Sequence, residues 1–145
     1  MEQREKLIQL LKQQIKIEKT HVDRITEMEK RVGNAAAKLL LLEMRLDSQK
    51  HEGILTGILK TLKGISPSQA LWKHKIESYV DPFVVKRELE THVKMETDVL
   101  AHVEEEMKHT KDEGLKLLLQ HIADDERKHH KILETIVKNV YKINP

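Results

Sequence analysis

Apolar side chains recur three or four residues apart along four long stretches of the chain, with polar residues between them. This period matches one face of an α-helix rather than the alternation of a β-strand. We therefore expect four helices, over about residues 3–32, 35–62, 82–109 and 113–141. Their apolar stripes include Leu7, Leu11, Ile25, Met28 and Val32 in the first helix, Leu41, Met44, Leu55, Ile58 and Leu62 in the second, Val85, Leu89, Val99 and Val103 in the third, and Leu115, Leu119, Ile122, Leu133 and Ile136 in the fourth.

The segments between these helices contain residues that end or start helices. Gly33 suits a helix C-terminus. Side chains that can accept a hydrogen bond from a first-turn N–H group precede three of the helices. They are Asn34, Asp81 and Thr110, and Asp81 is followed by Pro82. Thr110 begins a Thr-x-x-Glu capping box that ends at Glu113, and Asp112 is the alternative cap of the same helix.

The lengths of the links predict how the helices are connected. Short links join the first helix to the second and the third to the fourth, so each pair should form an antiparallel hairpin. Residues 63–81 form a long crossover, in which we expect a short helix near residues 68–77. The 145 residues are thus expected to form a single all-α domain, a four-helix bundle made of two helical hairpins.

The two halves of the chain resemble each other. A shift of 78 residues carries Glu18 onto Glu96 and His51 onto His129 without a gap. Matches among leucines could arise from composition, but matches among polar residues of the inner stripes could not easily do so. A match at one fixed offset predicts two copies of the same hairpin.

Five polar residues interrupt the apolar stripes near the midpoints of the helices, which come to one level in an antiparallel bundle: Glu18, His51, Glu96, Glu126 and His129. An unpaired buried carboxylate is costly, and Lys and Arg are nearly absent from the stripes. Glu126-x-x-His129 places two metal-binding groups on one helical face. The pattern predicts a pair of divalent cations held by carboxylates and imidazoles.

Composition narrows the classes of protein that remain. Charged residues make up 34% of the chain and aromatic residues 3%, the formal net charge is +2, and there is no cysteine. The mixed charges give no indication of nucleic-acid binding, and the missing cysteines exclude disulfides and iron–sulfur ligation. The first residues show no apolar signal region, and no apolar run could span a bilayer. We expect a cytoplasmic protein without a membrane or nucleic-acid partner.

Over about residues 5–140 the chain resembles the ferritin-like superfamily, and among its members the rubrerythrin type. Glu18 and Glu96 match the glutamates of the family's first and third helices. Glu126 and His129 match the Glu-x-x-His of the fourth helix, and His51 matches the histidine of the second. The resemblance implies a ferritin-like bundle with a di-iron centre that reacts with oxygen or peroxide. Because this sequence has no cysteine, we expect no rubredoxin-like iron module of the kind found in full rubrerythrins, and the resemblance then implies an external electron donor.

The sequence also departs from the family pattern. Ser48 occupies the position of the second helix's glutamate, so one bridging carboxylate is missing. Asp47 lies next to this position, and His21 and His92 are additional stripe histidines. Each of these three residues is a candidate for the missing ligand.

These observations favour an oxidoreductase that reduces peroxide or acts as a ferroxidase. Mixed carboxylate and histidine ligands favour iron, with manganese or zinc as alternatives. Two other functions stay open, a metal-storage or metal-sensing protein without activity and a metal-free interaction bundle. A hemerythrin-like oxygen carrier would need a histidine-rich pattern over the last three helices, which is not found. We expect a homodimer or a larger homo-oligomer.

Overall fold

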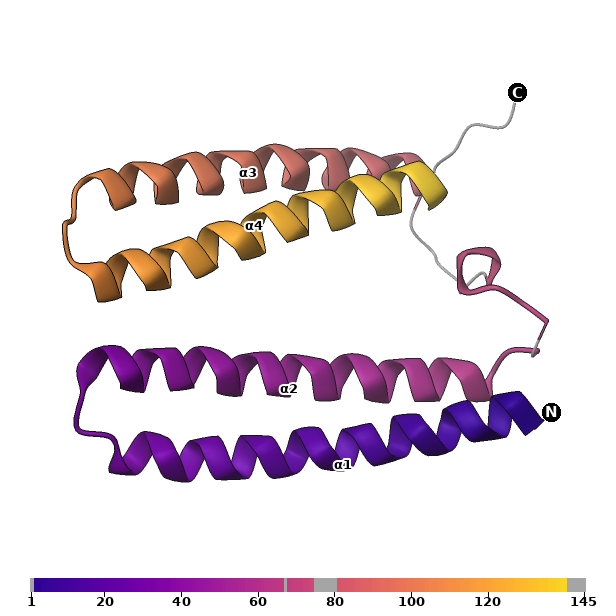
Figure 1. The fold of residues 1–145 in the computed structure, drawn as a ribbon. Helices are drawn as coiled ribbons and strands as arrows, with labels where there is room; N and C mark the ends of the chain where they lie inside the picture. The colour runs from indigo at the N-terminus through magenta and orange to yellow at the C-terminus, as the bar shows by residue number, and fades with distance from the viewer. Residues whose placement is uncertain (1, 67, 75–80, 141–145) are drawn as a thin grey trace. The chain divides into compact units, whose positions relative to one another are not determined.

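Figure 1 shows the computed structural model of the chain, in which residues 2–66, 68–74 and 81–140 are described. The elements are α1 (Glu2–Arg31), α2 (Ala35–Lys63), the short 3₁₀ helix η1 (Leu71–Lys73), α3 (Pro82–Lys108) and α4 (Glu113–Val140). The described residues contain no β-strand. The expectation of an all-α chain with four long helices is therefore confirmed.

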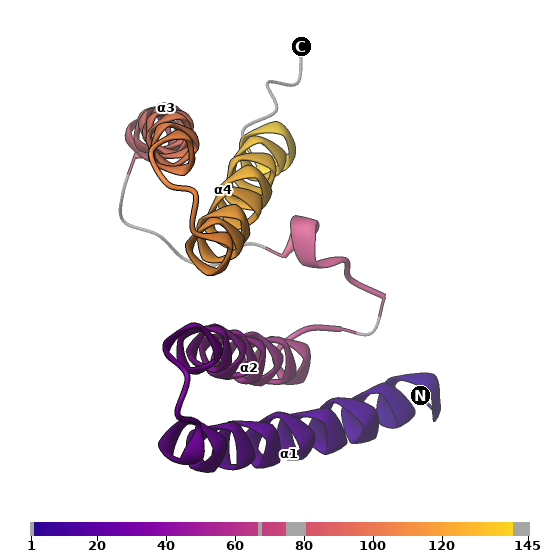
Figure 2. The same ribbon diagram turned by 60° about the vertical axis from the view of Figure 1, so that its left-hand side comes forward.

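The chain divides into two compact units, Met1–His74 and Lys75–Pro145. In the first unit, α1 and α2 run antiparallel and form the first hairpin (Figure 1). In the second unit, α3 and α4 form the second hairpin in the same way (Figure 2). Each hairpin therefore brings residues of two helices together across a short turn.

Side-chain caps explain where two of the helices begin. The Asn34 side chain accepts a hydrogen bond from the Ala37 N–H group at 3.1 Å, which fixes the start of α2. The Asp81 carboxylate accepts one from the Phe83 N–H group at 2.9 Å, with Pro82 as the first residue of α3. Both caps satisfy N–H groups that have no partner inside the helix. Both predictions are confirmed.

The cap of α4 is Asp112 rather than the Thr110 capping box. The Asp112 carboxylate accepts a hydrogen bond from the Leu115 N–H group at 2.9 Å. Thr110 accepts one from the Asp112 N–H group at 3.1 Å and so supports the cap. The helix begins at Glu113, so the third helical position is Leu115 and cannot supply the reciprocal bond of a capping box.

The start of the crossover is held against the first turn of α1. The Arg4 guanidinium donates hydrogen bonds to the carbonyl oxygens of Leu62 at 2.8 Å and Ser66 at 3.2 Å. These acceptors include a carbonyl of the last turn of α2, which has no partner within the helix. The short helix η1 lies within the region where a helix was expected, while residues 75–80 of that region lie outside the described residues.

The buried side chains mostly follow the expected stripes. In the first hairpin, Leu11, Ile25 and Leu55 are at most 8% exposed. In the second, Val103 is buried, but Ala123 is the α4 residue that is fully covered, while its neighbour Ile122 is 46% exposed. Within this hairpin, Ala123 thus lies in the core and Ile122 does not.

Other stripe residues remain about half exposed, among them Met28, Met44, Val99 and Leu115. Two helices can cover each other only along the seam where they touch, so a hairpin alone leaves part of each apolar stripe open. None of the described helices combines the length and the apolar character that a bilayer-spanning helix needs.

A half-buried ion pair joins α1 and α2. Arg45 Nε donates to Glu29 Oε1 at 2.7 Å, and the two side chains are 24% and 15% exposed. The residues 78 positions later are Ala123 and Met107, so the second hairpin has apolar groups where the first has the ion pair.

Arg45→Ala should lower the free energy of unfolding by about 1–3 kcal/mol, because Glu29 is left as a half-buried charge without its partner. The double variant Arg45→Ala with Glu29→Met copies the second hairpin and should recover most of this loss. Urea unfolding followed by circular dichroism measures both. If the double variant loses as much free energy of unfolding as Arg45→Ala and Glu29→Met lose together as single substitutions, this account is contradicted.

Candidate metal centre

Three metal-binding side chains meet inside the second hairpin. Glu96 lies on α3, and Glu126 and His129 lie one turn apart on α4. One ligand atom from each residue lies within 4.8 Å of the others. His129 Nδ1 is 3.9 Å from both Glu96 Oε2 and Glu126 Oε1. Among the described residues, this is the one group of three such side chains close enough to share a cation.

The positions along the helices explain why these residues meet. Residues three apart on an α-helix share a face, so Glu126 and His129 both turn toward the same side of α4. Because α3 runs antiparallel to α4, Glu96 in the middle of α3 faces them at the same level. The three residues that the sequence predicted to lie together in this half of the chain therefore have ligand atoms within 4.8 Å of one another.

The carboxylates of this group lack ordinary hydrogen-bond partners. Glu96 Oε2 and Glu126 Oε2 are buried and accept no hydrogen bond, and the same is true of Glu18 Oε2 in the first hairpin. Buried polar atoms in proteins nearly always have a partner. Three unpartnered carboxylate oxygens at the three predicted ligand positions therefore favour a site built for cations.

The first hairpin contains a smaller version of this arrangement. His51 Nδ1 lies 3.5 Å from Glu18 Oε1, and the Glu18 side chain is 13% exposed. The residue at the position equivalent to Glu126 is Ser48, which is 6% exposed. Glu18 and His51 thus make the same contact as Glu96 and His129, but without a second carboxylate.

The group in the second hairpin fits a divalent metal ion. Carboxylate oxygen and imidazole nitrogen atoms bind such ions at about 2.0–2.2 Å, so two ligands of one ion lie roughly 3–4 Å apart. The atoms of Glu96, Glu126 and His129 are only slightly farther apart, within the reach of small side-chain rotations. The two carboxylates also match the double charge of the ion.

The remaining predicted ligands are not in contact with these groups. Asp47 Oδ1 pairs with Lys50 Nζ at 3.2 Å on the surface of α2. His21 and His92 are exposed, and neither belongs to the group of three that the described residues form. Among the described residues, Asp47, His21 and His92 thus do not complete a group of three ligands within either hairpin.

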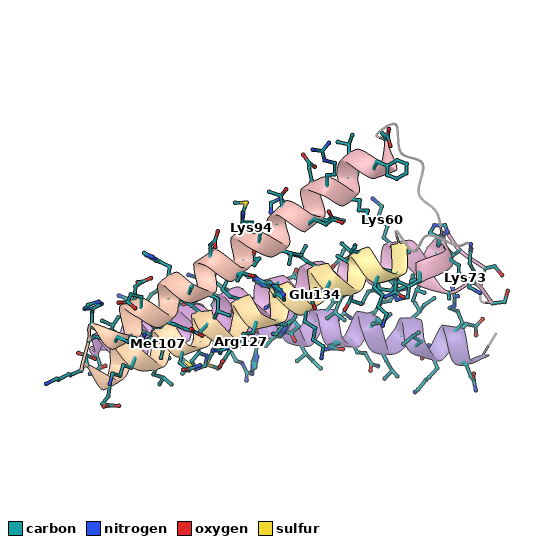
Figure 3. The ribbon with its side chains drawn as sticks, turned by 90° about the horizontal axis from the view of Figure 1, so that it is seen from above. Lys60, Lys73, Lys94, Met107, Arg127 and Glu134 are labelled. Carbon is teal, nitrogen blue, oxygen red and sulfur yellow. The ribbon has the colours of Figure 1, made fainter. Side chains whose placement is uncertain are left out.

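A second set of contacts involves sequence neighbours of these ligands, and no sequence pattern singled it out. His130 lies between Thr97 Oγ1 at 3.4 Å and Glu134 Oε1 at 2.9 Å, and Glu134 is labelled in Figure 3. Arg127 donates to Glu104 on α3 at 3.0 Å (Figure 3). Thr97, His130 and Arg127 are direct neighbours of the three ligand candidates. They link α3 to α4, and only their adjacency in the sequence to those ligands could have indicated this.

Antiparallel helices with carboxylate and histidine ligands at their midpoints define a class of helical carboxylate proteins that bind metal ions. The model of the Rubrerythrin family matches residues 9–137 of the chain. The chain belongs to the rubrerythrin family, and its fold class is the all-α, ferritin-like four-helix bundle. The searches of curated proteins and of solved structures found no match.

Proposed function

We propose that the protein is a two-metal carboxylate oxidoreductase that uses iron and reduces peroxide. The observation that supports this most is the set of three buried carboxylate oxygens without partners, on Glu18, Glu96 and Glu126. Each belongs to a side chain that also lies within 4 Å of a histidine nitrogen. Such oxygens are costly in a metal-free protein and become ligands when cations are present.

The described side chains have distinct roles in this proposal. Glu96, Glu126 and His129 hold one ion, and Glu18 and His51 supply the ligands of the other. Iron held by these residues would supply the two electrons that convert one peroxide and two protons to two water molecules, and an external donor would restore these electrons. Glu126 is 16% exposed and is the most buried carboxylate among the described residues of the second hairpin.

Access for a small oxidant is provided by the histidines. The His51 and His129 side chains are 50% and 44% exposed, while the carboxylates beside them are 13–25% exposed. Within each hairpin, the imidazoles are thus the more exposed part of the ligand group and the carboxylates the less exposed part. Three protein ligands leave further coordination positions for the oxidant.

The test is anaerobic loading with Fe²⁺ followed by addition of hydrogen peroxide. We expect two iron ions per chain, and one peroxide consumed for every two ferrous ions oxidised. With an external reductant the reaction should turn over. Glu126→Gln should lower iron affinity by at least roughly 10- to 100-fold, because loss of a direct ligand should cost no less than loss of a residue that only supports one.

Other results would point to the alternative functions. Faster oxidation by oxygen than by peroxide, with ferric iron retained, would indicate a ferroxidase or a store. Absence of metal by elemental analysis, in protein purified from its native host and after loading, would leave only an interaction bundle. The matched control is Glu104→Gln, which removes a carboxylate from an exposed ion pair on α3 and should leave peroxide consumption unchanged.

A further inference from the structure

The two hairpins do not offer equal numbers of metal ligands. The second hairpin brings Glu96, Glu126 and His129 within 4.8 Å of one another. Among the described residues, the first brings Glu18 and His51 together at 3.5 Å without forming a group of three ligands, and it has the buried Ser48 where the second has Glu126. The difference amounts to one ligand and one negative charge.

We propose that the two metal ions bind in a fixed order, the first in the second hairpin and the second, exchangeable one at the first hairpin. This inference rests on the proposed two-metal function and adds the order and the inequality of the two positions. The Glu96, Glu126 and His129 side chains are a complete set for one ion, because three protein ligands with an open position are the usual arrangement of a catalytic metal site. The Glu18 and His51 side chains alone are not.

The charges of the ligands also favour tighter binding at the second hairpin. Glu96 and Glu126 together carry two negative charges, and each has a buried oxygen without a hydrogen-bond partner. One divalent ion neutralises both charges and relieves the repulsion between them. Glu18 carries a single charge, so an ion at the first hairpin keeps a net positive charge that must be balanced by other ligands.

Residues near the first hairpin's pair do not remove this inequality. The Asp47 carboxylate is paired with Lys50 and is 45% exposed. His21 is exposed and, among the described residues, is not part of a group of three ligands. The Ser48 hydroxyl is neutral and is a poorer ligand for a hard cation than a carboxylate.

The test is titration of the full chain with Co²⁺, followed by visible absorption and calorimetry, so that no activity is measured. We expect two steps for the wild-type protein, the first at least roughly tenfold tighter than the second. His129→Ala should weaken the first step by a similar factor or more, and His51→Ala should weaken only the second. Circular dichroism confirms that each variant is folded.

The sharpest variant exchanges the two unequal residues. Ser48→Glu combined with Glu126→Ser keeps the number and kind of side chains constant and moves the third ligand to the first hairpin. The tight step should then depend on His51 and no longer on His129. The wild-type protein, which lacks the exchange, is the control.

The outcomes separate this inference from the proposed function. Two bound ions whose tighter step depends equally on His51 and His129, in the wild-type protein and after the exchange, would overturn the order while leaving the two-metal function intact. A single bound ion that depends on His129 would uphold the site in the second hairpin and overturn the two-metal function. No Co²⁺ binding would overturn both.

Discussion

Replacing Glu126 with glutamine should make the metal-free protein more stable and should largely remove the stabilisation that metal ions provide. The buried Glu126 Oε2 has no hydrogen-bond partner and lies near the carboxylate of Glu96. Removing its charge should raise the free energy of unfolding of the apo protein by about 1–3 kcal/mol, the range associated with an unsatisfied buried group.

The metal-bound protein should respond in the opposite direction. A ligand present at a hundred times its dissociation constant stabilises the folded state by about 2.7 kcal/mol, and Glu126→Gln should lose most of this gain. Thermal unfolding with a chelator and with Co²⁺ measures both effects.

A matched control is again Glu104→Gln, because Glu104 is 50% exposed and paired with Arg127. An exposed ion pair contributes only about 0–1 kcal/mol, so this variant should be slightly destabilised with or without metal. If Glu126→Gln and Glu104→Gln behave alike under both conditions, the carboxylate of Glu126 is not a metal ligand.

Ser48→Glu is the second substitution with a large expected effect. It should lower the dissociation constant of the second metal ion by roughly tenfold or more. The substitution gives the first hairpin the ligands that the second already has, and Glu126 shows that a glutamate fits at this level of a hairpin. Because Ser48 is 6% exposed, the new carboxylate should also destabilise the apo protein. Metal titration of the apo protein measures the change in metal affinity, and urea unfolding measures the change in stability.

Ser48→Gln is the control for the size of the new side chain. It should destabilise the apo protein through crowding but should not tighten metal binding to the same degree, since an amide oxygen carries no charge. If the wild-type protein binds one metal ion and Ser48→Glu adds none, the protein is a single-metal protein instead.

The local features of the fold could be predicted from the sequence because each depends on a few neighbouring residues. Asn34 and Asp81 cap helices since their short side chains reach back to first-turn N–H groups. The cap of α4 was ambiguous because Thr110 and Asp112 are both good caps, and only the point at which the helix begins decides between them.

The site could be predicted in part for a similar reason. Helical periodicity is enough to place Glu126 and His129 on one face and to bring Glu96 opposite to them. It could not decide the orientation of His21 and His92, which are exposed. A straight helix drifts by about 20° per heptad relative to a 3.5-residue repeat, so periodicity alone does not fix which way a residue at the edge of a stripe points.

The inequality of the hairpins bears on how the protein is made. A ribosome synthesises the chain from its N-terminus, so Glu18 and His51 emerge well before Glu126 and His129. On the proposed order of binding, the part of the chain made first cannot retain a cation firmly by itself. Tight capture begins only when nearly all of the described chain has emerged, and the nascent protein is thereby kept from trapping metal ions before its second half is complete.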